Sequence, residues 1–143
     1  MIDAVIRFAP AHDAVAVDLW DGDLPMLPDM RAIQVEPRRW WVFGAPDIAD
    51  AIGDRGAASP FGGGLMRATI TGPGWRTLLS ISALFDVEHP GFGVGQVAST
   101  VIHHVPVRIV VVGPDVCDLY CPASLAGTLE SLWRTATAGG TDG

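Results

Sequence analysis

Three apolar segments separated by turn residues occupy positions 96–121 of this 143-residue chain. They are typical of consecutive β-strands, with Pro106 in the first turn and residues 113–115, Gly-Pro-Asp, in the second. The middle segment contains an unbroken apolar run over residues 109–112, which predicts a central strand covered on both faces. Any fold that accommodates this part of the chain contains a β-sheet.

Two strand-and-helix pairs precede these segments. Residues 38–44 predict a buried strand, and a short helix is predicted to begin near Pro46 and to end at Gly53 or Gly56. Residues 65–72 alternate between two sets of side chains, as a strand does, and residues 73–85 predict a second helix. The apolar stripe of that helix is expected to face the sheet and consists of Leu78, Ile81, Leu84 and Phe85.

A last helix is predicted over residues 121–137, where Leu125, Leu129, Leu132 and Trp133 recur at helical spacing. The expected order is β-α followed by β-α-β-β-β-α. Helices that cover a mostly antiparallel sheet place the chain in the α+β class.

The predicted domain organisation is simple. Residues 1–30 are rich in Asp and Pro and predict an extended N-terminal arm, with one short alternation around Val17. Residues 31–138 are expected to form a single α+β domain, with a flexible connector over 57–64, and residues 139–143 a disordered tail.

Composition excludes several classes of partner. The chain has a net charge of −7, and its arginines are scattered, with only Arg38 and Arg39 adjacent, so it offers no electrostatic footprint for nucleic acid. No apolar run approaches the roughly 20 residues that span a bilayer, and the N-terminus lacks the features of a signal peptide. With 49% hydrophobic and only 17% charged residues, part of the surface is expected to be buried against partner chains.

No catalytic, metal or cofactor site is predicted in this chain. The sequence contains no lysine, which excludes Schiff-base chemistry and a lysine-dependent phosphate loop. His103 and His104 are adjacent in a predicted strand and would point to opposite faces. Cys117 and Cys121 share a face but lie about 13 Å apart in a strand, too far for a disulfide or a joint zinc site. They are expected to be two buried thiols of a reducing compartment.

The glycine-rich runs and the acidic residues have plainer interpretations. Residues 61–64 and 91–95 each precede a strand, the reverse of the order that a pyrophosphate-binding loop needs. The N-terminal carboxylates lack the alternation and the closing Glu of a calcium loop. These carboxylates are expected to form a solvated acidic face or to dock on a basic partner. The four residues are Asp18, Asp21, Asp23 and Asp29.

Residues 66–137 resemble the gamma subunit of heterotetrameric sarcosine oxidase in four pieces that occur in the same order. The pieces are ATITGPGWRTLLS at 68–80, LFDVEHPGFGVGQVAST at 84–100, HHVPVRIVVV at 103–112 and CDLYCPASLAGTLESLWRTA at 117–136. Upstream, RRWWVFGAPD at 38–47 resembles the family's Trp-rich strand and the turn that follows it.

The resemblance implies a fold of β-α-β-β units related to the folate-binding domain of the aminomethyltransferases. It implies a small, non-catalytic, cytoplasmic subunit of an oxidoreductase complex, with no active site of its own. Such complexes oxidatively demethylate an N-methyl amine, acting on its CH–NH bond, and pass the one-carbon unit to tetrahydrofolate. The implied partners are alpha, beta and delta subunits, and the FAD, FMN, NAD, zinc and tetrahydrofolate sites would belong to them.

The residues that would contact such partners are expected among exposed arginines and aromatic side chains, because these types anchor protein interfaces. They are Arg38, Arg39, Phe61, Phe92 and Arg108. The alternative function is a stand-alone folate-binding module, with a pocket lined by Trp40, Trp41, Trp75 or Arg76. The folate-active aminomethyltransferases carry an Asn- and Lys-containing catalytic stretch, and this chain contains neither residue type.

Overall fold

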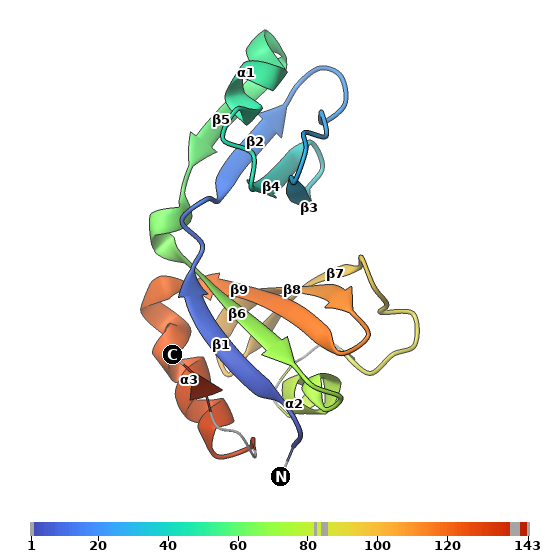
Figure 1. Cartoon of the computed structure of the whole chain (residues 1–143), viewed down its shortest axis with the longest axis vertical. Helices are drawn as coiled ribbons and strands as arrows, with labels where there is room; N and C mark the ends of the chain where they lie inside the picture. The colour runs from blue at the N-terminus through green and yellow to red at the C-terminus, as the bar shows by residue number, and fades with distance from the viewer. Residues whose placement is uncertain (1, 82, 84–85, 138–140, 143) are drawn as a thin grey trace. The chain divides into compact units, whose positions relative to one another are not determined.

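The computed structural model describes residues 2–81, 83, 86–137 and 141–142. It divides the chain into two compact units, which are visible in Figure 1. Unit 1 consists of residues 1–10 and 64–143, and unit 2 consists of residues 11–63. This division differs from the predicted arm, single domain and tail, because the boundary falls inside the predicted arm.

Unit 1 is built on a six-stranded sheet in the order β10-β1-β6-β9-β8-β7. Every pair of neighbours is antiparallel except β1 with β10. The α+β class and the mostly antiparallel sheet are therefore confirmed. The strands are β1 (Val5–Pro10), β6 (Leu65–Thr71), β7 (Val97–Ile102), β8 (Val105–Gly113), β9 (Val116–Pro122) and β10 (Thr141–Asp142).

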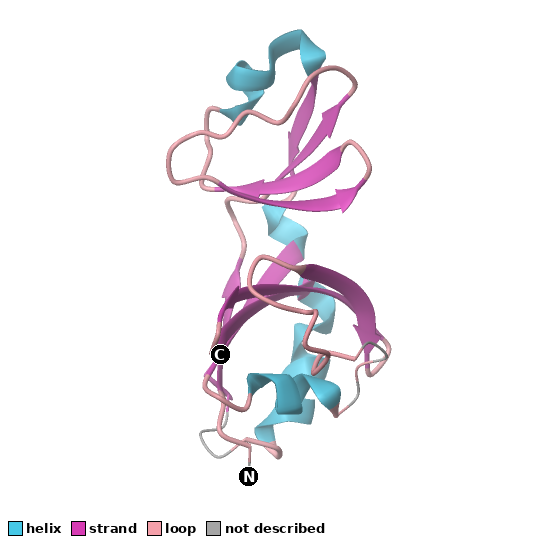
Figure 2. Ribbon diagram, turned by 90° about the vertical axis from the view of Figure 1, so that its right-hand side faces the viewer, coloured by secondary structure: helices cyan, strands magenta, loops and turns pink. Residues whose placement is uncertain are grey.

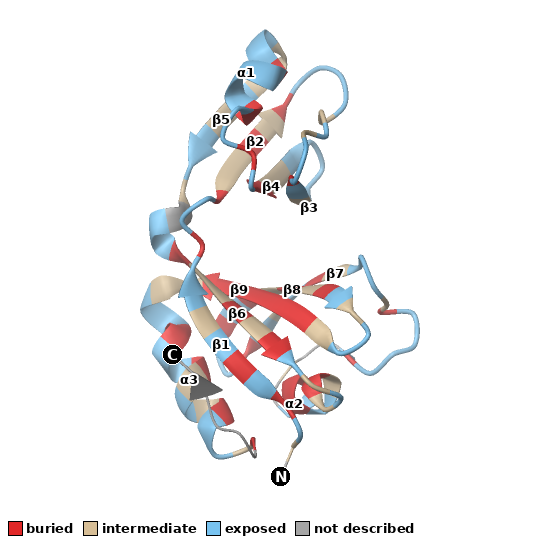
Figure 3. Ribbon diagram, viewed as in Figure 1, coloured by how far each residue is buried: buried red, intermediate tan, exposed pale blue. Residues whose placement is uncertain are grey.

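The helices of unit 1 pack on one face of this sheet, as Figure 2 shows. They are α2 (Trp75–Ser80) and α3 (Ala126–Arg134), the latter preceded by a 3-10 turn, η3 (Ala123–Leu125). Side chains at alternate positions of the strands meet the helices, with Ala68, Leu119 and Ile109 side by side on β6, β9 and β8. Trp75 and Trp133 fill the core from the two helices, and the buried positions concentrate on the central strands (Figure 3).

Three predicted features of unit 1 differ from the structure. Helix α2 ends at Ser80, so Ile81 is 50% exposed, and Leu84 and Phe85 lie outside the described residues. Leu125 precedes α3 and is 37% exposed, so Ala126 takes its place in the core. On β8, Ile109 and Val111 are buried while Val112 is 45% exposed, because helices cover only one face of the sheet.

The turn between β7 and β8 also lies elsewhere than predicted. It consists of His103 and His104, whose φ angles are +49° and +69°. A two-residue hairpin loop with both φ angles positive is a type I′ turn, which matches the twist of the strands it joins. Pro106, predicted to mark the turn, instead lies in β8 opposite Val101.

Unit 2 is a four-stranded antiparallel sheet in the order β3-β4-β2-β5. Its core contains Val17, Val42, Ile48 and Ile52, since helix α1 lies against one face. The predicted flexible connector is largely β5, paired with β2. The elements are β2 (Val15–Leu19), β3 (Arg31–Glu36), β4 (Arg39–Phe43), α1 (Ile48–Ile52), the 3-10 turns η1 (Gly53–Arg55) and η2 (Gly62–Gly64), and β5 (Gly56–Pro60).

The N-terminal thirty residues are not an arm. They supply β1 to the sheet of unit 1 and β2 to the sheet of unit 2. Ile6 on β1 is fully buried, and Val17 is fully buried on β2, so each strand completes a separate core. The predicted tail lies partly outside the described residues, and Thr141–Asp142 pairs in parallel with β1. Among the described residues, no helix is long and apolar enough to cross a membrane.

Candidate interaction surfaces

Three of the five predicted interface residues lie in unit 2. Arg38 sits in the β3–β4 turn with φ +66°, and its guanidinium donates to the carbonyl oxygens of Leu19, at 3.1 Å, and Gly22, at 2.8 Å. Arg39 forms an ion pair with Asp18, its Nε 2.7 Å from the carboxylate, and both side chains are 45% exposed. This pairing raises the pKa of the Arg39 guanidinium. Both arginines thus brace the β2–β4 region from its surface.

Phe61 is half-buried and stacks obliquely on Trp41, with ring centroids 5.1 Å apart. The contact belongs to the face of the unit 2 sheet opposite α1, since Trp41 lies next to Trp40, which packs against the helix-side core. Two aromatic rings at the end of β5 and on β4 give this face an apolar character.

The remaining two predicted residues lie in unit 1, and one of them was wrongly assigned to the surface. Phe92 is only 4% exposed and belongs to the core under the sheet, with the Arg76 guanidinium 5.8 Å from its ring. Val87, from the same loop after α2, is buried in this core as well. Arg108 lies on β8 and donates to the hydroxyl of Ser99 at 2.7 Å.

The residues considered for a folate pocket are not assembled into one site. Trp40 and Trp41 are consecutive on β4 and point to opposite faces of the unit 2 sheet. Trp75 is buried in the core of unit 1 and donates from its ring nitrogen to the Pro114 carbonyl oxygen at 3.0 Å. Arg76 lies over the Trp75 ring at 4.4 Å and donates to the Val87 carbonyl oxygen at 2.7 Å. Trp75 therefore ties α2 to the turn between β8 and β9, and Arg76 ties it to the loop that follows α2.

The face of the unit 1 sheet that carries no helix has a polar row which the sequence analysis did not identify. Arg67, Tyr120 and Arg108 are directly opposite one another on β6, β9 and β8. Arg67 Nε donates to the Tyr120 hydroxyl at 3.1 Å, and its guanidinium lies 5.3 Å from the ring centroid. Two residues further along β6, on the same face of the sheet, the Thr69 hydroxyl donates to the buried Asp118 carboxylate at 2.8 Å.

These side chains form a hydrogen-bonded row in which Tyr120 and Asp118 are buried. Tyr and Arg are the residue types that contribute most at protein interfaces, since they combine apolar area with directed hydrogen bonds. The signal was present in the sequence as the alternation of Arg67 and Thr69 in β6, but the pairing with β9 was needed to bring Tyr120 and Asp118 beside them. Because Tyr120 and Asp118 are buried, Arg67 and Arg108 are members of the row that are partly open to a partner.

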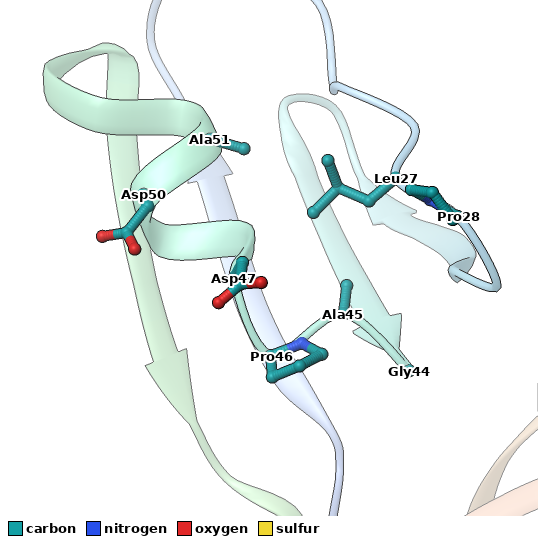
Figure 4. A pocket seen from close by; sticks show the side chains of 8 residues that line it. All are labelled: Leu27, Pro28, Gly44, Ala45, Pro46, Asp47, Asp50 and Ala51. Atoms are coloured by element: carbon teal, nitrogen blue, oxygen red, sulfur yellow. The ribbon is translucent and has the colours of Figure 1, made fainter.

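A second candidate surface is a groove in unit 2 with a volume of about 530 Å³. Figure 4 shows it between α1 and the loop that precedes β3. Its lining is mainly apolar and includes two carboxylates, and it consists of Leu27, Pro28, Gly44, Ala45, Pro46, Asp47, Asp50 and Ala51. The acidic residues predicted to form a solvated face are exposed at Asp21, Asp23 and Asp29, whereas Asp18 is paired with Arg39.

The two cysteines are buried in the core of unit 1 and carry free thiols. Burial raises the pKa of the Cys121 thiol to about 11. For Cys117, burial and then the neighbouring Asp118 carboxylate raise the pKa further, against a smaller lowering by Arg76. Both side chains are thus protonated at neutral pH. Within the described parts of the chain, no three His, Cys, Asp or Glu residues are grouped in a way that could hold a metal ion.

No family model matches the sequence, and no curated protein matches it either. Among solved structures, a chain of heterotetrameric sarcosine oxidase from Corynebacterium sp. U-96 in complex with pyrrole 2-carboxylate is similar. The TM-score is 0.75 at 14% sequence identity, and the likeness covers 90% of this chain and 81% of that chain. Coverage of this extent includes residues of both units. At this identity the likeness shows the fold.

Proposed function

We propose that this protein is a small, non-catalytic, gamma-type subunit of a heteromeric, sarcosine oxidase-like flavoenzyme complex. In this proposal the complex oxidatively demethylates an N-methyl amine and passes the one-carbon unit to tetrahydrofolate. The FAD, FMN, NAD, zinc and tetrahydrofolate sites lie in alpha, beta and delta type partner subunits, and the assembly is cytoplasmic.

The observation that carries the proposal is the fold. A chain of a heterotetrameric sarcosine oxidase shares it over 90% of the present chain, so the likeness extends well beyond one structural motif. The ordered sequence pieces at 68–80, 84–100, 103–112 and 117–136 point to the same family independently of the coordinates.

The surface supports a role in assembly. Trp20 is 66% exposed and Met26 is 67% exposed, and both lie in the loop between β2 and β3. Exposure of large apolar side chains to water is unfavourable in free energy, and burial against another chain removes this unfavourable contribution.

The test is purification of the chain, carrying an affinity tag, after co-expression with the genes that flank it. We expect it to bring down larger chains that show the visible absorption of a bound flavin and that oxidise an N-methyl amine. Purification of the chain alone as a stable monomer, with no flavin-bearing chain attached under conditions where the flanking products are soluble, contradicts the proposal.

Titration of the isolated chain with tetrahydrofolate, followed by tryptophan fluorescence, tests the alternative of a stand-alone folate module. We expect no saturable change, because Trp75 and Arg76 are engaged within the core of unit 1 and Trp40 and Trp41 face opposite ways. A saturable change that is lost in Trp41→Phe would favour the folate module instead.

A further inference from the structure

The groove of unit 2 is held open by main-chain hydrogen bonds. On the loop side, the Met30 amide donates to the Leu27 carbonyl oxygen at 3.2 Å. On the helix side, the Ala51 amide donates to the Asp47 carbonyl oxygen at 3.1 Å. Gly44 joins the two sides with φ +70°, and a Cβ at this position would lie 2.8 Å from the Asp29 carbonyl oxygen. A groove with fixed walls binds without a large ordering cost.

The lining of the groove combines an apolar floor with two exposed carboxylates. Figure 4 shows Leu27 on the loop facing Ala51 on α1, with Asp50 also on α1 and Asp47 immediately before it. Within the described part of the chain, neither carboxylate takes part in an ion pair or a side-chain hydrogen bond. The groove thus presents apolar contact area and negative charge together.

The charge distribution of the chain strengthens this feature. Unit 2 has nine acidic residues and four arginines, so it carries −5 of the total charge of −7. The arginines of unit 2 interact with groups outside the two groove carboxylates: Arg39 pairs with Asp18, and Arg38 and Arg55 donate to main-chain carbonyl oxygens. Arg31 lies over the Phe43 ring at 5.9 Å. A basic occupant would therefore be attracted both by the groove and by the unit that surrounds it.

We propose that this groove is the docking site for a basic, apolar segment of a partner polypeptide. The inference rests on the proposed function, because it assigns the contact between this chain and another subunit. Arg and Lys side chains place their aliphatic stems on apolar surface while their charged ends stay in water. Such side chains fit a floor formed by Leu27, Ala45 and Pro46 beside the carboxylates of Asp47 and Asp50.

Binding of a labelled synthetic peptide to the full chain, measured by fluorescence anisotropy, tests the groove directly. The probe is a short peptide of alternating Leu and Arg, compared with one in which Glu replaces Arg and one in which Ser replaces Leu. We expect saturable binding of the Leu/Arg peptide alone, weakened by added salt because the charged contacts are exposed. Equal binding of the Leu/Glu or the Ser/Arg peptide would overturn the proposal.

Two pairs of matched variants locate the binding. Ala51→Trp fills the groove, whereas Ala49→Trp places the same ring on an exposed position of α1 that does not line it. Asp47→Asn with Asp50→Asn removes the carboxylates, and Asp21→Asn with Asp23→Asn makes the same change in net charge elsewhere in unit 2. We expect Ala51→Trp to abolish binding and the first aspartate pair to weaken it roughly three- to tenfold. Loss of binding to the same extent in the control variants would overturn the proposal.

The same variants separate this inference from the proposed function. If the flavin-bearing complex assembles equally well with Ala51→Trp and with the unaltered chain, the groove is not the docking site and the proposed function stands. If no complex forms with the unaltered chain, the proposed function fails, and the peptide titration decides the groove by itself. Concentration-dependent dimerisation of the chain that Ala51→Trp abolishes would assign the groove to a second copy and overturn the proposal.

Discussion

At the scale of single residues, the turn between β6 and α2 depends on two glycines. Gly72 has φ +117°, and a Cβ there would lie 2.7 Å from the Asp3 carbonyl oxygen. Gly74 is crowded by Ile2 and Asp3 in the same way, and its amide donates to the Asp3 carbonyl oxygen at 2.9 Å. The N-terminal residues can reach β6 and start β1 only because no side chain stands in this turn.

Gly72→Ala is therefore expected to reduce the free energy of unfolding by about 1–3 kcal/mol or more, since it combines backbone strain with a close contact to main chain. Urea denaturation followed by tryptophan fluorescence measures the effect. Gly63→Ala is the matched control, because a Cβ at Gly63 meets nothing within 4 Å and its φ is not in the positive region. Equal stability of the two variants would contradict this account of the turn.

The buried thiols give the protein a specific alkaline behaviour. An unfolded Cys ionises around its ordinary pKa of 9.0, whereas Cys121 in the folded protein ionises at about 11. The thiol stays protonated in both states below pH 9, so its contribution to stability is fully present there. As the pH rises from 9 to 11, the unfolded state loses its proton first and stability falls.

Cys121→Ala is expected to flatten the loss of stability between pH 9 and pH 11, relative to the unaltered chain, when the unfolding midpoint is measured at each pH. Few other side chains ionise between pH 9 and pH 11, because the chain contains no lysine and a single tyrosine. The difference between the two proteins therefore reports on Cys121. An identical pH dependence for both proteins would show that the thiol does not ionise differently in the two states.

At the scale of elements, the sequence pattern predicted β6, β7, β8 and β9, but not β1, β10 or the turn between β7 and β8. His103 and His104 both have positive φ, which L-residues with a Cβ adopt only at a cost. The two imidazole rings lie 5.9 Å apart within the turn. Among the described residues, no contact outside the turn explains why histidine occupies both positions.

Replacing His103 with Asn and His104 with Gly is expected to stabilise the protein by about 0.5–1 kcal/mol, because Asn-Gly is the preferred pair of a type I′ turn. The thermal unfolding midpoint measures the gain. The same two residues introduced at Val101 and Ile102, within β7, should destabilise instead, since Ile102 is fully buried. A loss of stability from the turn variant would show that the turn has another geometry.

At the scale of the whole molecule, unit 2 is inserted between two strands that are neighbours in the sheet of unit 1. β1 ends at Pro10, β6 begins at Leu65, and Pro10 lies opposite Met66. The core clusters of the two units share no residue. Unit 1 thus has a complete sheet and core without the inserted residues.

Replacement of residues 11–63 by a two-residue Asn-Gly turn is therefore expected to leave a folded unit 1. Near-ultraviolet circular dichroism of the buried Trp75 and Trp133 and a cooperative thermal transition measure its folding. We expect this shortened chain to lose the Leu/Arg peptide binding entirely, because the groove lies in unit 2. A shortened chain without cooperative unfolding would show that the units depend on each other.

Among the candidate surfaces, the sequence identified residue types better than it identified positions. Arg38, Arg39 and Arg108 are at the surface or half-buried, as an interface requires, but each is already held by a neighbour within its unit. Phe92 was misplaced, because a loop aromatic carries no local sign that a core lies beneath it. The groove was missed because its lining comes from separate segments around residues 27–28 and 44–51.

The sequence alone determined the local structure of β6 and the starts and apolar stripes of α2 and α3. Alternation in residues 65–72, the glycine-proline signal before α2 and the spacing of Leu129 and Trp133 each depend on near neighbours in the chain, so they predict strands and helices directly. Only the tertiary structure decided which sheet each strand joins. Val5–Pro10 pairs with residues more than fifty positions away, and Val15–Leu19, a few residues later, joins another sheet. Periodicity predicts which side chains of a strand face a core. Which of the two cores they join depends on the apolar area that the strand buries against distant strands, and this area is defined only in the folded structure.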